Sequence, residues 1–411
     1  MKKYIKFIIF LVLLIVFIVL LNLDANAENY NVHNPFPKTS GNIFDSESTT
    51  IDILSEIYKT ANANGVKNNM PEAAEKYLGS NNWGDDDLNI ADLSEKFSFG
   101  FIFNIIMRLL GTLTSVAVKN FVPALALIIL SAVIGVLKNL YGNDGKDHFS
   151  DIINFVLLVC LAGAVFFNVR ECFYTAKKFL DDIHVYMMTM IPVMASLATI
   201  SGNISSAVAN SAGLYVVLNV IDAISGNIIL PVLQICFALS LARQLTASAE
   251  TVNLSGISSY ICSVLNWIFI FIMTILTAVL LFQNILASSA DTVAARTVKF
   301  TVSSFVPVVG GMIGDISRTI IGSIQVVKGI TGIFGVLVII ITLLPPLITV
   351  ILNKLMLKLS GAFALILGME KQADFLKEMN SLLDITVAVM ISSAVVFIFD
   401  ITVFIKTVAV Y

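Results

Sequence analysis

Acidic side chains inside long apolar runs are the residues of this sequence best suited to chemistry. Asp222 lies in the apolar run 214–233, and Asp400 lies in the apolar run 385–410. In proteins that span a membrane, such charges often belong to ion paths or proton relays. The same charges can instead pair with a neighbour or lie at the edge of the bilayer. The sequence leaves both interpretations open.

The spacing of the other reactive residues does not match an enzyme. A zinc protease places two histidines one helical turn apart, whereas His33, His148 and His184 are far apart. The glycines of 142–147 are too close together for a phosphate-binding loop, and Asp147 stands where that motif needs Ser or Thr. We therefore expect no catalytic residues.

Asp315 ends the sequence Gly-Met-Ile-Gly-Asp over 311–315, which has one residue more than the Gly-x-Gly-Asp motif of intramembrane aspartyl proteases. No convincing second aspartate accompanies it. Arg318 follows three residues later, so we expect an ion pair between the two along one helix face.

The cysteines also lack the spacing of metal ligands. Three of them lie in strongly apolar surroundings, where a thiol behaves as a small hydrophobic group. We expect neither a disulfide framework nor a metal site, and no cofactor. The four residues are Cys160, Cys172, Cys236 and Cys262.

The composition is that of a membrane protein. Hydrophobic residues make up 57% of the chain and charged residues 13%, against about 25% charged residues in soluble proteins. A formal net charge of −3 gives no basic surface for nucleic acid, so no nucleic-acid partner is expected. The sequence predicts an all-α, polytopic transmembrane helical bundle in the lipid bilayer, with broken or re-entrant helices.

The beginning of the chain predicts export. Residues 1–27 resemble a signal peptide, with basic residues before the apolar run 8–21 and an Ala-Asn-Ala cleavage site at 25–27; the alternative is an uncleaved anchor. Residues 28–96 carry twelve acidic and five basic residues. This polar, acidic segment is expected outside the cytoplasm, as a small helical unit or a partly disordered one, before the membrane domain 97–411.

About six to eight spans are expected after residue 96. Residues 171–184 predict an amphipathic interfacial helix, and 185–243 is long enough for a half-span or re-entrant piece followed by two helices. Polar breaks are expected at 244–259 and 288–299. The clearest spans are 121–140, 152–169, 260–287, 330–352 and 385–410, with a further apolar helix at 94–120 that carries Arg108.

Prolines and paired glycines predict breaks in several helices, because proline removes a backbone donor and glycine is a weak helix former. The expected breaks are Pro192, Pro231, Pro345 and Pro346, with a further one at Pro307, Gly310 and Gly311. Pro192 and Pro307 share similar neighbours, and each is followed by a proline 39 residues later. This spacing suggests a weak duplication of 150–260 in 265–400, as in transporters; chance similarity between apolar helices is the alternative.

Two longer motifs carry a resemblance to a known family. Glu-Thr-Val-Asn-Leu-Ser-Gly-Ile-Ser-Ser at 250–259 leads into Leu-Asn-Trp-Ile at 265–268, and Asp-Thr-Val-Ala-Ala-Arg-Thr-Val-Lys-Phe at 291–300 leads into Phe-Val-Pro-Val-Val-Gly-Gly at 305–311. The chain resembles the stage III sporulation protein AE family of endospore-forming bacteria over nearly its whole length. In that family Gly often follows the aspartate of the second motif, where this chain has Thr292.

The resemblance implies a role during engulfment in sporulation. Proteins of this family are made in the mother cell and join the other stage III A sporulation proteins in the membrane around the forespore. That assembly is thought to meet the forespore Q protein across the intermembrane space and to form a secretion-like channel that sustains the forespore and its late gene expression. The exported segment 28–96 would lie in that space.

The expected functional core is 251–256 and 291–315. Irregular backbone at membrane depth must be buried in protein or line a wet cavity, so these residues either line a pore or pack against partner subunits. A permease-like transporter of small solutes, with Asp222, Asp315 or Asp400 coupling ions, is the competing function. The candidate residues are Asn253, Ser255, Gly256, Asp291, Arg296, Pro307, Gly310, Gly311, Asp315 and Arg318.

Overall fold

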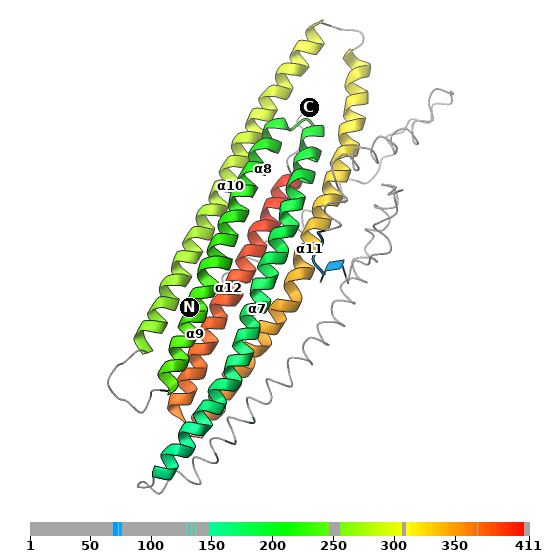
Figure 1. The fold of residues 1–411 in the computed structure, drawn as a ribbon. Helices are drawn as coiled ribbons and strands as arrows, with labels where there is room; N and C mark the ends of the chain where they lie inside the picture. Colours follow the sequence, from blue (N-terminus) through cyan, green and yellow to red (C-terminus); the bar gives the residue numbers. More distant parts are fainter. Residues whose placement is uncertain are drawn as a thin grey trace.

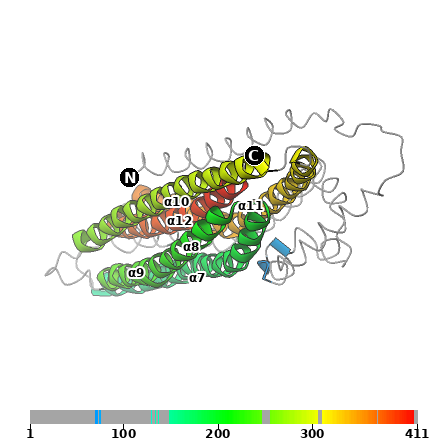
Figure 2. The same cartoon turned by 90° about the horizontal axis from the view of Figure 1, so that it is seen from above.

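A computed structural model describes residues 69–72, 74–75, 129, 133, 136, 148–245, 255–305, 310–367 and 369–406. These residues form long helices that lie side by side along one axis (Figures 1 and 2), with no strand among them. The predicted signal peptide and the spans at 94–120 and 121–140 lie outside this part of the chain, apart from three isolated helical residues in the second span. The helices are α7 (His148–Ile200), α8 (Ile204–Ile221), the π-helix η1 (Asp222–Ile229), α9 (Leu230–Leu245), α10 (Ser255–Phe305), α11 (Gly310–Ile366) and α12 (Glu370–Lys406).

Five stretches of the described residues are long and apolar enough to cross a membrane. One of them, Ile204–Ala242, combines α8, η1 and α9 in a single helical column. The prediction of an all-α transmembrane bundle is therefore confirmed. The other four are Leu161–Ile200, Tyr260–Asp291, Thr331–Ile366 and Gln372–Ile405.

Pro192 does not break its helix, contrary to the sequence prediction. It lies inside α7, which continues for eight more residues to Ile200. The helix survives because the flanking side chains of Met190, Val193 and Met194 are buried in the bundle, and neighbouring helices can hold a proline-containing membrane helix in shape. Residues 185–200 are thus the end of α7 and not a re-entrant piece.

Pro345 and Pro346 do not break their helix either, so this prediction is also wrong. Both lie inside α11, which runs on for another twenty residues to Ile366. Thr349 Oγ1 donates a hydrogen bond of 3.1 Å to the carbonyl oxygen of Pro345, so a side chain satisfies a backbone acceptor close to the prolines.

Pro231 coincides with a real irregularity, although the chain stays helical there. It is the second residue of α9, immediately after the π-helix. The Leu230 N–H donates to Ser225 O, five residues back. Proline has no N–H for the regular ladder, and a wider turn before it accommodates this loss.

Two polar stretches, one predicted as a separate interfacial helix and one as a break, are continuous with the helices around them. Residues 171–184 lie in the middle of α7, and 288–299 lie in the second half of α10. Neither stretch contains proline or glycine, and a polar sequence can remain helical once neighbouring helices support it. In this region α10 ends at Phe305 and α11 begins at Gly310.

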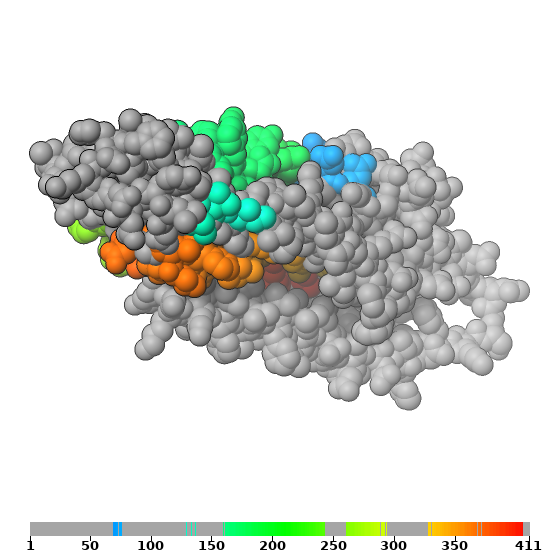
Figure 3. Space-filling model, turned by 90° about the horizontal axis from the view of Figure 1, so that it is seen from below, coloured from blue at the N-terminus to red at the C-terminus, as the bar shows by residue number. Residues whose placement is uncertain are grey.

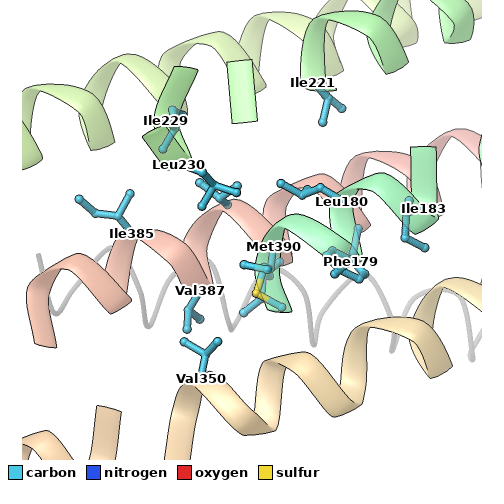
Figure 4. Close-up of a cluster of buried hydrophobic side chains, with 14 of the residues drawn as sticks. Phe179, Leu180, Ile183, Ile221, Ile229, Leu230, Val350, Ile385, Val387 and Met390 are labelled. Carbon is cyan, nitrogen blue, oxygen red and sulfur yellow. The ribbon is translucent and has the colours of Figure 1, made fainter. Parts of the chain in front are cut away.

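The core of the bundle is built around α12. In its most apolar window 78% of the residues are buried, against 22% for α10, so α12 is the central helix and α10 lies at the edge. Figure 4 shows Ile385, Val387 and Met390 of α12 between Leu230 of α9 and Val350 of α11.

Small residues allow α11 and α12 to approach closely. A Cβ atom added at Gly332 would overlap the Ile405 side chain, and one added at Gly335 would lie 2.9 Å from Met190 and 3.1 Å from Ile401. Glycine at these two positions lets the helices approach closely, and a larger residue would force the Ile405 and Met190 side chains to move.

Candidate functional site

The turn between α7 and α8 is a tight, fully hydrogen-bonded corner. Gly202 has φ 86°, a conformation that favours glycine. The Asn203 N–H donates to Ala198 O at 3.0 Å, and the Gly202 N–H donates to Thr199 O at 3.0 Å. This pair of bonds is the Schellman ending of a helix, and it reverses the chain directly into α8.

Asp291 of α10 caps the start of α8 from outside that helix. The Ser205 N–H donates to Asp291 Oδ1 and the Ser206 N–H to Asp291 Oδ2, both at 2.8 Å. Asn203, the N-cap residue, makes no side-chain cap of its own. A carboxylate satisfies free N–H groups and favours the positive end of the helix dipole. Asp291 thereby joins α10 to the α7–α8 corner at the ends of three candidate spans.

The structure places the backbone of most of the other residues of the two motifs. Ser255 and Gly256 begin α10, Arg296 lies in its second half, and Gly310, Gly311, Asp315 and Arg318 lie in the first turns of α11. The structure describes their backbone but not their side chains. Asn253 and Pro307 lie outside the described residues. The expected ion pair between Asp315 and Arg318 stays a prediction.

Asp222 opens the π-helix and faces α7. A Cβ atom added at Gly226 would lie 3.2 Å from Asp222 Oδ1 and 2.9 Å from Lys177 Nζ. Lys177 forms an ion pair of 2.7 Å with Asp181. The carboxyl groups of Asp222 and Asp181 therefore lie near the ammonium group of Lys177, beside Gly226, which has no side chain to fill the space.

Asp400 lies in α12, and its side chain is buried. It lines a small cavity together with residues of α7 and α8, among them Asn210 and Ser211. The structure thus brings Asp400 towards the α7–α8 corner that Asp291 caps. It does not bring Asp222 to the same place, because Asp222 follows the last residue of α8 whereas the corner precedes its first.

Sequence reasoning missed one buried and one partly buried cation. Lys328 of α11 is 1% exposed, and its Nζ lies 4.6 Å from the ring centre of Phe404. Lys354 of α11 forms an ion pair with Asp384 of α12, and each side chain is 17% exposed. The sequence feature that could have revealed them is a single lysine just outside each end of the apolar run 330–352.

A short turn of the polar N-terminal segment contacts α7. Pro71 and Ala74 are buried, and Lys178 Nζ lies 3.4 Å from Glu72 Oε2. Figure 3 shows this turn in blue beside the green atoms of α7. The turn lies against the charged middle of α7, which includes Arg170, Glu171 and Asp181.

Within the residues that the structure describes, no three His, Cys, Asp or Glu side chains gather as metal ligands. Cys172, Cys236 and Cys262 are free and buried. Among the described side chains, the structure shows helix capping by Asp291, ion pairs such as Lys354–Asp384, and the isolated buried acid Asp400.

Comparison with known proteins gives a consistent match. The family model described as stage III sporulation protein AE matches residues 89–408. A protein named stage III sporulation protein AE from Bacillus subtilis (strain 168) is 24% identical over 276 residues. That alignment covers 66% of this chain and 65% of the relative, so it spans just under two thirds of the relative's length. No solved structure matches this chain.

Proposed function

Because this chain belongs to the stage III sporulation protein AE family, we propose that it is a membrane subunit of the channel complex that links the mother cell to the forespore. A role in sporulation follows from the family, and the five apolar helical stretches make it a multi-pass membrane protein. In the proposed role it works during engulfment, sustains forespore development and late gene expression, and catalyses no reaction.

The length of the helices is the observation that carries this proposal. α7, α10 and α11 contain 53, 51 and 57 residues, which at 1.5 Å per residue is about 80 Å each. The hydrocarbon core of a bilayer is about 30 Å thick. Helices of this length have parts outside the bilayer, where partner proteins can bind.

The proposed partners are the other stage III A sporulation proteins in the same membrane and the forespore Q protein across the intermembrane space. The proposed location is the mother-cell membrane around the forespore, with a cleaved signal peptide at 1–27 and segment 28–96 in the intermembrane space. The acidic character of that segment and the contact between Glu72 and Lys178 support an N-terminal unit docked on the membrane domain 97–411.

The middle of α7 supports binding to another protein. An outward stripe of polar side chains is exposed there, next to apolar neighbours such as Phe167 and Val185. Charged groups facing acyl chains are expensive, so this stripe favours a protein or water environment. The stripe consists of Arg170, Glu171, Tyr174, Lys178 and Asp181.

Copurification from sporulating cells tests the proposal. The tagged full-length chain is expected to bring down other stage III A proteins, and replacing Arg170 and Lys178 by glutamate together is expected to reduce that recovery. The matched control replaces the exposed, uncharged Phe167 by leucine and leaves recovery unchanged. Normal spores from cells that lack the protein, or a chain that copurifies with none of these proteins, would contradict the proposal.

The competing function, a permease for small solutes, is favoured by one observation, the buried carboxyl group of Asp400 beside a cavity. Purified chain in liposomes separates the two functions. A permease moves solute alone and loses this activity in Asp222→Asn or Asp400→Asn variants that still assemble. A subunit of the proposed complex moves none without its partners.

A further inference from the structure

Asp400 is an isolated acid within the membrane-spanning part of α12. It lies five residues before the end of the candidate span at Ile405, and its side chain is 6% exposed. Within the described part of the chain, neither a hydrogen bond nor an ion pair reaches its carboxyl group. Leaving a carboxylate buried in this way is costly, so a group other than a described side chain is needed to satisfy it.

A cavity lies beside this carboxyl group, between α7, α8 and α12. Its volume is about 10 Å³, which is about the space that one water molecule needs. The α7 wall includes Met194, two residues after Pro192, and the α8 wall includes Ala207, close to the helix start that Asp291 caps. The cavity therefore lies close to the α7–α8 corner, where the candidate spans end.

The polar lining of the cavity suits a water molecule. Ser211 Oγ donates to Ala207 O at 2.6 Å, which leaves its lone pairs free to accept a hydrogen bond. The Asn210 amide offers both donors and an acceptor. A water between Asp400 and Asn210 has at least the two polar partners that a buried water requires.

The charged and titratable groups around Asp400 come from several helices. Lys328 of α11 lies over Phe404, one turn beyond Asp400. Asp291 of α10 is already held by Ser205 and Ser206, and α7 contributes the buried Tyr186. α9 also packs against α12.

We propose that Asp400 is a proton-binding carboxyl group inside the bundle, and that one water held between Asp400 and Asn210 connects it to the membrane edge at the α7–α8 corner. On binding, the carboxylate takes one proton from this water path and becomes a neutral carboxylic acid; on release, the same proton returns to the water. A metal cation fits less well because hard cations take about six oxygen ligands and Lys328 would repel them.

Labelling with dicyclohexylcarbodiimide tests the proposal on the full-length chain in phospholipid vesicles. This apolar reagent adds to a neutral carboxylic acid and forms a stable N-acylurea, which mass spectrometry locates. Asp400 is expected to be labelled at mildly acidic pH, with a loss of about tenfold per pH unit once the acid is mostly ionised. Asp374, exposed on the same helix, is the matched control and stays unlabelled.

Four results would overturn the proposal. Wild-type protein that resists the reagent at every pH contradicts it, and so does labelling that appears only in Lys328→Met, since Asp400 would then be a fixed ion-pair partner. Protection by sodium chloride at constant pH would indicate a metal site. Asn210→Leu is expected to slow labelling about tenfold, and an unchanged rate in a variant with a wild-type gel-filtration profile would refute the water path. None of these results depends on partner proteins, so the test is independent of the proposed function.

Discussion

At the residue scale, single side chains connect helices that are distant in the sequence. Asp291 and Ser206 are 85 residues apart, and one carboxylate satisfies two N–H groups of α8. Lys354 and Asp384 join α11 to α12 within their candidate spans. These contacts show Asp291 capping α8; its expected place in a pore or a subunit contact stays a prediction.

Replacing Asp291 by alanine is expected to lower the free energy of unfolding by about 1–2 kcal/mol, because two N–H groups at the α8 start lose their acceptor. The Asp291→Asn variant keeps one acceptor oxygen and should lose about half as much. Thermal unfolding in detergent measures both changes. Ser289→Ala is the control, since Ser289 is exposed and bonds only within α10. Equal stability of Asp291→Ala and wild type would rule out the cap as a stabilising contact.

Breaking the Lys354–Asp384 pair should cost more. Lys354→Met leaves the mostly buried Asp384 without its partner, and the expected loss is about 3–5 kcal/mol. The double variant Lys354→Met/Asp384→Leu should recover most of this loss, since the unpaired charge is gone. A double-mutant cycle of detergent unfolding measures the coupling, and additive single effects would show that the pair contributes nothing.

At the element scale, neighbouring helices decide whether a local signal ends a helix. Pro192, Pro345 and Pro346 lie inside helices that buried side chains hold on several sides. Pro231 widens the turn before it into a π-helix without ending the helical column. The proposed duplication of 150–260 in 265–400 stays a prediction, and Pro192 and Pro307 differ in setting, because Pro192 lies within α7 and Pro307 follows the end of α10.

Substitutions at two glycines of α11, Gly332 and Gly329, test the close approach of α11 to α12. Gly332→Ala should destabilise the bundle by about 1–3 kcal/mol because the new methyl group overlaps Ile405. A Cβ atom at Gly329, one turn earlier on α11, meets nothing within 4 Å, so Gly329→Ala should stabilise by about 0.5–1 kcal/mol through helix propensity. Denaturation in detergent compares the two, and a loss of the same size in both variants would refute the close approach.

At the scale of the whole molecule, a polar N-terminal turn packs against the charged middle of α7. Ala74 is fully buried and Glu72 pairs with Lys178. Residues 69–75 of the acidic segment, as far as the structure describes them, thus lie beside charged residues of α7. The domain boundaries at residues 27 and 96 stay predictions.

A cysteine pair tests this docking in membranes. In a chain with its four native cysteines replaced by alanine, Glu72→Cys and Lys178→Cys should form a disulfide on mild oxidation, which mass spectrometry detects as a linked peptide pair. Glu72→Cys with Tyr260→Cys, at the exposed start of α10, is the control and should not cross-link. Cross-linking of the control at the same rate would mean that the turn has no fixed site.

The sequence alone determined the class of this protein, because helix length and apolar composition are local properties that the bilayer selects directly. The spans 260–287 and 330–352 and most of the last one were found in this way, and two motifs were enough to indicate the family. The tertiary structure decided which local signals end a helix, since the cost of a proline depends on its neighbours. Only the tertiary structure showed that Asp400 lies beside Asn210 and that Asp291 caps the start of α8. Contacts between residues far apart in the chain exist only once the helices have packed.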